Sequence, residues 1–147
     1  YLAGRGLPVC IAGEGAAAGA IGVMEVIGDD EVTEGGYGYD NKQNWEGKIG
    51  YELVDDAEAR AAAAVALAGW RALRCRDGGR VDVKSDAGGR PHFIEVNPLA
   101  GLHPDYSDLV FLANFAGLTY QDLIAEIVAS FLARHPDLAA RHGAARA

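Results

Sequence analysis

The sequence predicts an α+β domain with a mostly antiparallel sheet that helices cover. Two runs of β-branched and aromatic residues between Arg80 and Asn97 flank the turn sequence "DAGG", a pattern typical of a β-hairpin. Apolar residues recur at helical spacing over 56–74 and 119–134. A chain of 147 residues is long enough for one domain with its own core and short for two.

Charge and composition narrow the classes of partner. The net charge of −8 argues against nucleic acid, whose phosphates bind lysine and arginine. Acidic residues can still bind a nucleotide through Mg²⁺, and they also favour solubility. The longest apolar run, 61–70, is too short and too rich in alanine to span a bilayer, so we expect no membrane partner. Cys10 and Cys75 fit no metal-ligand spacing, and we expect a reducing, cytoplasmic setting.

The first third of the chain predicts three strands, over 7–12, 21–27 and 48–54. The segment "GEGAAAG", 13–19, has only a loose likeness to a phosphate-binding glycine loop. Because a strand rather than a helix follows it, a flexible hairpin loop is the better interpretation. The polar, glycine-rich segment 29–47 carries aromatic residues, which favours a loop that packs or covers a ligand.

The remainder of the chain predicts three helices, over 56–74, 107–116 and 119–134. Asp55 or Asp56 caps the first helix, Ser107 or Asp108 the second, and Thr119 the third.

The predicted hairpin separates into two chemically different faces, because side chains alternate along a strand. Val81 and Val83 share one face of the first strand, opposite to Arg80, Asp82 and Lys84. On the returning strand, Ile94 and Val96 share a face, opposite to Phe93, Glu95 and Asn97. A turn centred on Gly88–Gly89 places Asp82 opposite Glu95, so that one face gathers Arg80, Asp82, Glu95 and Asn97.

Two facing carboxylates repel each other unless a positive charge neutralises them. Arg80 alone would make a structural ion-pair network. A hard cation is the alternative, because Mg²⁺ takes oxygen ligands from carboxylates and amides and is usually completed by phosphates. The pattern by itself allows both interpretations.

The stretch "RVDV…GGRPHFIEVNPLAGL" resembles the metal site of the ATP-grasp superfamily, and is most similar to the C-terminal part of D-alanine–D-alanine ligases. The resemblance extends from about Tyr1 to Phe131. It implies that residues 1–134 are the C-terminal portion of an ATP-grasp domain. Alanine, arginine and glycine dominate from His135 onward, so we expect a weakly ordered tail, a weak helix or a frayed end, over 135–147.

The resemblance implies ATP as a cofactor together with two Mg²⁺ ions, with Mn²⁺ as an alternative ion. Asp82 would hold one ion, Glu95 would bridge both, and Asn97 would complete the second. Arg80 and the backbone at Gly101 would stabilise the negative oxygen that develops during acyl transfer.

Further residues receive roles from the same resemblance. The segment "YGYDNKQ" is similar to the family's loop over the ATP phosphates, with Lys42 as the phosphate-binding lysine. The family commonly places a serine after the glycine at position 101, where it binds the carboxylate of the acceptor. Ser107 lies one residue later than that pattern, and Tyr106 and His103 are equally plausible contacts to the substrate.

The implied activity is that of an ATP- and Mg²⁺-dependent carboxylate–amine ligase that joins two small amino acids through an acyl phosphate. A homodimer is expected. Because the chain starts at Tyr1 without an initiator methionine, we expect a fragment that needs an N-terminal region for full activity.

The sequence also departs from the family. "GRGLPV" stands where the family tends to read "GREFTV", so Gly6 replaces an acidic residue and Pro8 lies inside a strand, which is expected at a sheet edge. The alternative function is therefore a truncated, non-catalytic domain that binds Mg²⁺-nucleotide weakly or acts in assembly.

Overall fold

The computed structural model describes residues 1–28, 49–138 and 140 of the chain. In this part, five strands form one antiparallel sheet in the order β3-β2-β1-β4-β5. The strands are β1 Gly6–Ala12, β2 Gly19–Gly28, β3 Ile49–Leu53, β4 Gly78–Ser85 and β5 Pro91–Asn97. The helices are η1 Gly15–Ala17, α3 Ala57–Ala72, α4 Asp108–Phe115 and α5 Tyr120–Arg134. The predicted α+β class and the mostly antiparallel sheet are confirmed.

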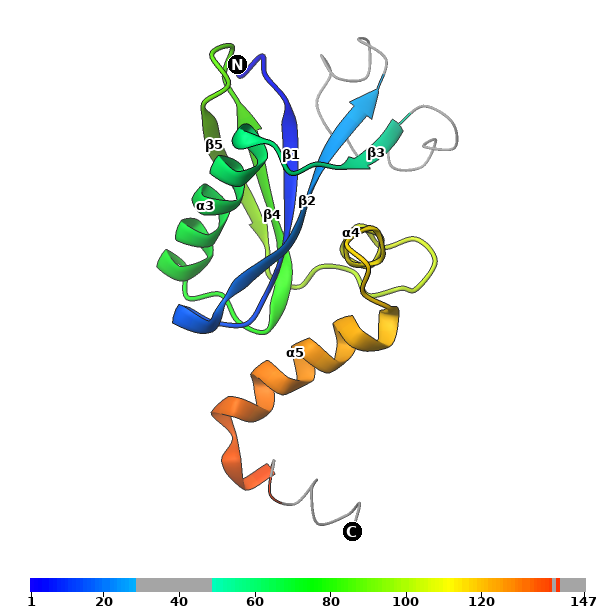
Figure 1. Cartoon of the computed structure of the whole chain (residues 1–147). Helices are drawn as coiled ribbons and strands as arrows, with labels where there is room; N and C mark the ends of the chain where they lie inside the picture. Colours follow the sequence, from blue (N-terminus) through cyan, green and yellow to red (C-terminus); the bar gives the residue numbers. More distant parts are fainter. Residues whose placement is uncertain (29–48, 139, 141–147) are drawn as a thin grey trace.

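The central strand β1 is buried on both faces, because helices lie on either side of the sheet (Figure 1). Its alternate residues Leu7, Val9 and Ile11 belong to the core beneath α3. Cys10 points the other way, into a second core that contains Met24 and the apolar face of α4. The strand therefore lacks the alternation of a half-exposed strand.

Pro8 was expected at a sheet edge, and the strand that contains it is instead central. Backbone hydrogen bonds on either side of this strand point Arg5 and Gly13 toward β4: the Ser85 amide donates to the Arg5 carbonyl at 2.9 Å, and the Gly13 amide donates to the Asp77 carbonyl at 2.8 Å. Between these two residues, backbone groups alternate in direction. The backbone nitrogen of Pro8 therefore faces β2. The pairing of β1 with β2 starts only at Val9, so β2 offers no paired residue opposite Pro8. The missing amide hydrogen of the proline therefore costs no ladder hydrogen bond, as at the edge of a sheet.

Helix α3 packs closely on the sheet because its buried face is made of small residues and one large aromatic. The buried residues are Ala59, Ala62, Ala66 and Trp70. The Trp70 indole donates to the Gly13 carbonyl at 3.0 Å, which ties the helix to the turn after β1. Gly79 of β4 makes room for this ring: a Cβ at that position would lie 2.9 Å from two Trp70 ring carbons and 2.6 Å from the Asn97 carbonyl.

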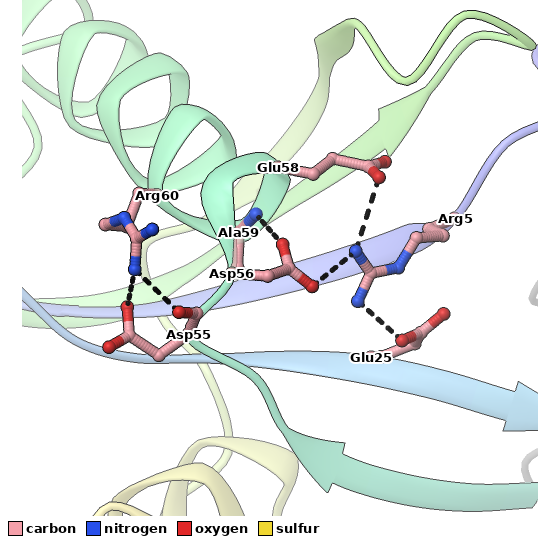
Figure 2. Close-up of polar contacts among 7 residues, drawn as sticks. All are labelled: Arg5, Glu25, Asp55, Asp56, Glu58, Ala59 and Arg60. Atoms are coloured by element: carbon pink, nitrogen blue, oxygen red, sulfur yellow. Dashed lines mark hydrogen bonds and ion pairs between the residues drawn. The ribbon is translucent and has the colours of Figure 1, made fainter.

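The N-terminus of α3 is fixed by charge, as Figure 2 shows. The N-cap Asp56 accepts from the Ala59 amide at 2.8 Å and from Arg5 at 2.8 Å. Arg5 also binds Glu25 of β2 at 2.6 Å and Glu58 of α3 at 3.3 Å. One guanidinium therefore joins the start of the helix to two neighbouring segments of the sheet.

The β4–β5 hairpin confirms the predicted pairing of Asp82 with Glu95, but the assignment of Phe93 and Ile94 to faces was wrong. A β-bulge follows the Asp82–Glu95 pair, because Val83 pairs with Phe93 and leaves Ile94 as the extra residue. The ring of Phe93 consequently shares the face of Val83 and lies against Gly69 of α3. Ile94 is 51% exposed.

The second face of the sheet is covered by α4, and not chiefly by the predicted 119–134 helix. Four residues of α4 are buried, whereas α5 buries only Leu123 and reaches the sheet where Ile127 approaches Gly78. Thr119 caps α5 as predicted, in a capping box with Asp122. Among the described helices, none is individually long and apolar enough to cross a membrane, and α4 and α5 pass that test only together, across a bend of 107°.

Gly79→Ala tests the close packing of α3 on β4. The added methyl group would overlap the Asn97 carbonyl and the buried Trp70 ring, and we expect a loss of about 1–3 kcal/mol in the free energy of unfolding. Gly19→Ala is the matched control, because a Cβ at that strand position meets nothing within 4 Å. Denaturant unfolding of the two variants measures the difference, and equal stabilities would contradict the packing argument.

The charge at the α3 N-terminus predicts a dependence of stability on pH. The Ala59 amide and the Arg5 guanidinium hold the pKa of Asp56 below its usual value. A carboxyl group whose pKa is lowered by folding stabilises the folded protein at every pH above its ordinary pKa of about 4. This contribution is lost as the pH falls through the pKa that the group has in the folded protein. Asp56→Asn keeps a good cap and removes the charge, so its melting temperature should lie below that of the wild type at pH 7 and approach it at pH 3.

Asp55→Asn serves as the control for the loss of one negative charge at the same end of the helix, because Asp55 binds the exposed Arg60 rather than Arg5. A gap between wild type and Asp56→Asn that is the same at pH 7 and pH 3 would contradict the role of the Arg5–Asp56 pair.

Candidate active site

A buried arginine lies at the centre of the polar face of the hairpin. The side chain of Arg80, on β4, is 11% exposed. Its Nε and Nη2 donate to the two carboxylate oxygens of Asp82 at 2.8 and 3.0 Å, and its Nη1 donates to Asp108 at the start of α4. A planar guanidinium held on two sides by carboxylates has a fixed orientation.

Asn97 and Glu95 complete the group from β5. The Asn97 amide nitrogen donates to Asp82 Oδ2 at 3.1 Å and to Glu95 Oε1 at 3.3 Å, so it lies between the two carboxylates. Burial raises the pKa of Asp82, and the charge of Glu95 adds to this effect, whereas Arg80 opposes it. A positive charge between Asp82 and Glu95 would therefore be stabilising.

The chemistry of this donor set fits a hard divalent cation. Asp82 and Glu95 offer carboxylate oxygens, the ligands that Mg²⁺ and Mn²⁺ prefer. Asn97 offers an amide oxygen of the same kind once its amide group turns, because its nitrogen now faces the two acids. Within residues 1–28, 49–138 and 140, no group of three or more His, Cys, Asp or Glu side chains could hold a metal ion. A cation at this hairpin would thus rely on an amide oxygen and on ligands from outside the described residues, such as phosphates.

The segment after β5 returns to the hairpin at the start of α4. A Cβ at Gly101 would lie 2.8 Å from Ser107 Oγ, so the glycine backbone rests against this buried serine. Ser107 Oγ accepts from the His103 amide at 2.7 Å. Because Asp108 follows Ser107 and binds Arg80, both Gly101 and Arg80 lie beside the start of α4.

His103 and Tyr106 are two of the exposed residues of this segment. Their rings stack with centroids 3.6 Å apart and planes inclined by 18°. His103 Nδ1 accepts from the Asp105 amide at 3.2 Å. The two rings therefore present one aromatic surface beside Ser107, although Ser107 itself has its hydroxyl directed into the loop.

The structure brings Arg80, Asp82, Glu95 and Asn97 together as the alternation predicts. Gly101, Ser107, His103 and Tyr106 gather in the adjacent segment. Lys42 and the predicted loop 29–47 lie outside the described residues, as does most of the predicted tail beyond residue 140. At Gly6, a Cβ would meet only the side chain of Val26, at 3.9 Å, so the local packing does not require glycine there.

Sequence reasoning missed the role of Asp108. Its position after Ser107 suggested only a helix cap, but the cap residue is Ser107 and the Asp108 carboxylate binds an arginine 28 residues earlier in the chain. An acidic residue in the first turn of a helix is common, and no local pattern distinguishes this one.

Comparison with known proteins assigns residues 1–129 to the family model described as D-ala D-ala ligase C-terminus. The D-alanine--D-alanine ligase of Bordetella petrii is 34% identical over 130 residues, a match that covers 87% of this chain and 38% of the relative. The enzyme of the same name from Cupriavidus metallidurans is 29% identical over 140 residues, covering 93% of this chain and 41% of the relative. The chain thus spans about two-fifths of the length of these curated relatives.

Solved structures share the fold. The D-alanine--D-alanine ligase from Bacillus anthracis complexed with ATP superposes with a TM-score of 0.68 at 21% identity, over 93% of this chain and 41% of that chain. The D-alanine-D-alanine ligase from Coxiella burnetii gives a TM-score of 0.68 at 15% identity, over 99% of this chain and 36% of that chain. The described sheet and helices are therefore those of the corresponding part of these ligases.

Proposed function

The chain belongs to the D-alanine–D-alanine ligase C-terminus family, and we propose that the protein containing it is an ATP-dependent carboxylate–amine ligase that joins two D-alanine molecules. The observation that carries the proposal is the cluster of Arg80, Asp82, Glu95 and Asn97 at one end of the hairpin. This cluster brings together the buried guanidinium of Arg80 and the carboxylates of Asp82 and Glu95, and the Gly101 backbone lies in the adjacent segment. Positive charge and hard oxygen ligands for a metal ion are the groups that stabilise acyl and phosphoryl transfer.

Mg²⁺ is the proposed metal, and Mn²⁺ is chemically equivalent for these ligands. Asp82, Glu95 and Asn97 would hold it. When bound, the ion would neutralise the charge of the ATP phosphates during phosphoryl transfer. The raised pKa of Asp82 supports this proposal, because a carboxyl that burial and a neighbouring acid destabilise in its charged form gains from a nearby cation.

The proposed reaction forms an acyl phosphate from ATP and the carboxylate of the first D-alanine. The amine of the second D-alanine then attacks the acyl carbon, and phosphate leaves. Arg80 would stabilise the oxygen that becomes negative in this attack, together with the backbone at Gly101. The contact between Gly101 and Ser107, and the bond from Arg80 to Asp108, support a shared site for both groups.

The acceptor amino acid is proposed to bind beside Ser107, His103 and Tyr106. The exposed stacked rings offer a surface for a small substrate, and the Ser107 hydroxyl can donate a hydrogen bond while it accepts from His103. Lys42 is proposed to bind the ATP phosphates on the basis of the resemblance alone.

Glu95→Gln in the full-length gene product tests the metal assignment. We expect ATP-dependent phosphate release with D-alanine to fall about a hundredfold or more, because a ligand charge is lost. The melting temperature should stay the same or rise, since Glu95 is exposed and its charge raises the pKa of Asp82. Glu52→Gln is the matched control, because Glu52 is an exposed glutamate on β3, away from the hairpin.

A Glu95→Gln variant that is destabilised but active would show that the acids serve only a structural network with Arg80 and Asn97. A wild-type gene product without ATP-dependent ligation would instead favour a non-catalytic domain.

A further inference from the structure

Asp108 is the second carboxylate on Arg80, and it comes from a different element than the first. Asp82 lies two residues from Arg80 on β4 and occupies its Nε–Nη2 edge. Asp108 is the first residue of α4 and accepts from Nη1. The side chains of Asp82 and Asp108 are 25% and 24% exposed, so both pairs are largely shielded from water.

The position of α4 does not depend on this pair. The helix buries Leu109, Val110, Leu112 and Ala113 in the second core, together with Cys10 and Met24. Burial of four apolar side chains stabilises a helix position by far more than one ion pair does. The Asp108 carboxylate therefore matters more to the orientation of Arg80 than to the placement of the helix.

We propose that Asp108 is a positioning residue that holds the Arg80 guanidinium in its reactive orientation toward the developing negative oxygen. The inference rests on the proposed function, in which Arg80 acts on that oxygen. Asp82 is also a proposed metal ligand, so its carboxylate would have to bind both Arg80 and the metal ion. Asp108 is not among the proposed metal ligands, and it holds the guanidinium through a different nitrogen, Nη1.

Asp108→Asn in the full-length gene product tests the proposal, because asparagine keeps the shape and loses the charge. We expect kcat to fall about tenfold to a hundredfold, since small displacements of a catalytic group cost this much. The KM for ATP should change by less than about twofold, because the lost interaction acts in the transition state. In a protein that already carries Arg80→Lys, Asp108→Asn should cause no further decrease in kcat. The effects of two substitutions are not additive when one residue acts through the other.

Asp77→Asn is the matched control. Asp77 accepts two hydrogen bonds from Arg134, at 2.5 and 2.8 Å, so this variant also removes a carboxylate from an arginine pair. That pair joins the residue just before β4 to the last residue of α5, and it contains none of the residues of the proposed site. We expect a lower melting temperature with kcat unchanged within about twofold. An Asp108→Asn variant that behaves like Asp77→Asn, or whose loss adds to that of Arg80→Lys, would overturn the proposal.

A second readout separates this proposal from the proposed function. In protein labelled with ¹⁵N-arginine, a guanidinium held on two sides rotates slowly and gives resolved Nη signals, and those of Arg80 are assigned by their absence in Arg80→Lys. Asp108→Asn should average these signals, and Asp77→Asn should leave them resolved. If the wild type lacks ligase activity, the proposed function fails, yet averaged Arg80 signals in Asp108→Asn still support the positioning role and unchanged signals overturn it.

Discussion

The burial of the Arg80 guanidinium constrains the whole polar end of the sheet. A buried charge is costly unless carboxylates pair with it, and Arg80 obtains one from its own strand and one from α4. Asp82 in turn faces Glu95 across the strand pair, and Asn97 donates to both acids. The register of the hairpin therefore brings these charges together, and the start of α4 joins them through Asp108.

Close packing of α3 fixes β4 near its start, next to Arg80. Because Gly79 has no side chain, the Trp70 ring and the Asn97 carbonyl can both approach the strand just before Arg80. The alanine face of α3 allows the helix to lie near enough for Trp70 to reach the Gly13 carbonyl. The apolar core beneath α3 therefore lies on one face of β4, and Arg80 lies on the other face, which it shares with its pairing partner Cys10.

Short sequence patterns correctly predicted the elements whose residues repeat with a strand or helix period. Alternation gave the hairpin and the Asp82–Glu95 pair, and capping residues gave the starts of α3 and α5. Alternation carries no signal for the residue that a bulge leaves unpaired, so Phe93 and Ile94 were assigned to the wrong faces. Two features depend instead on which segments, far apart in the sequence, come together in the fold: the central position of the strand that contains Pro8, and the Arg80–Asp108 pair. A single sequence does not contain that information in any short window.

The two carboxylates on Arg80 differ in what they can do. Both oxygens of Asp82 accept from the guanidinium in the described structure, and Oδ2 also accepts from Asn97. A carboxylate that also serves as a metal ligand must give up some of these bonds, and an arginine with no other partner would then lose its orientation. Asp108 binds a different nitrogen from a different element, and α4 is held in place by its own core. If Asp82 binds the proposed metal, the second carboxylate would hold Arg80 in place while the first changes partners.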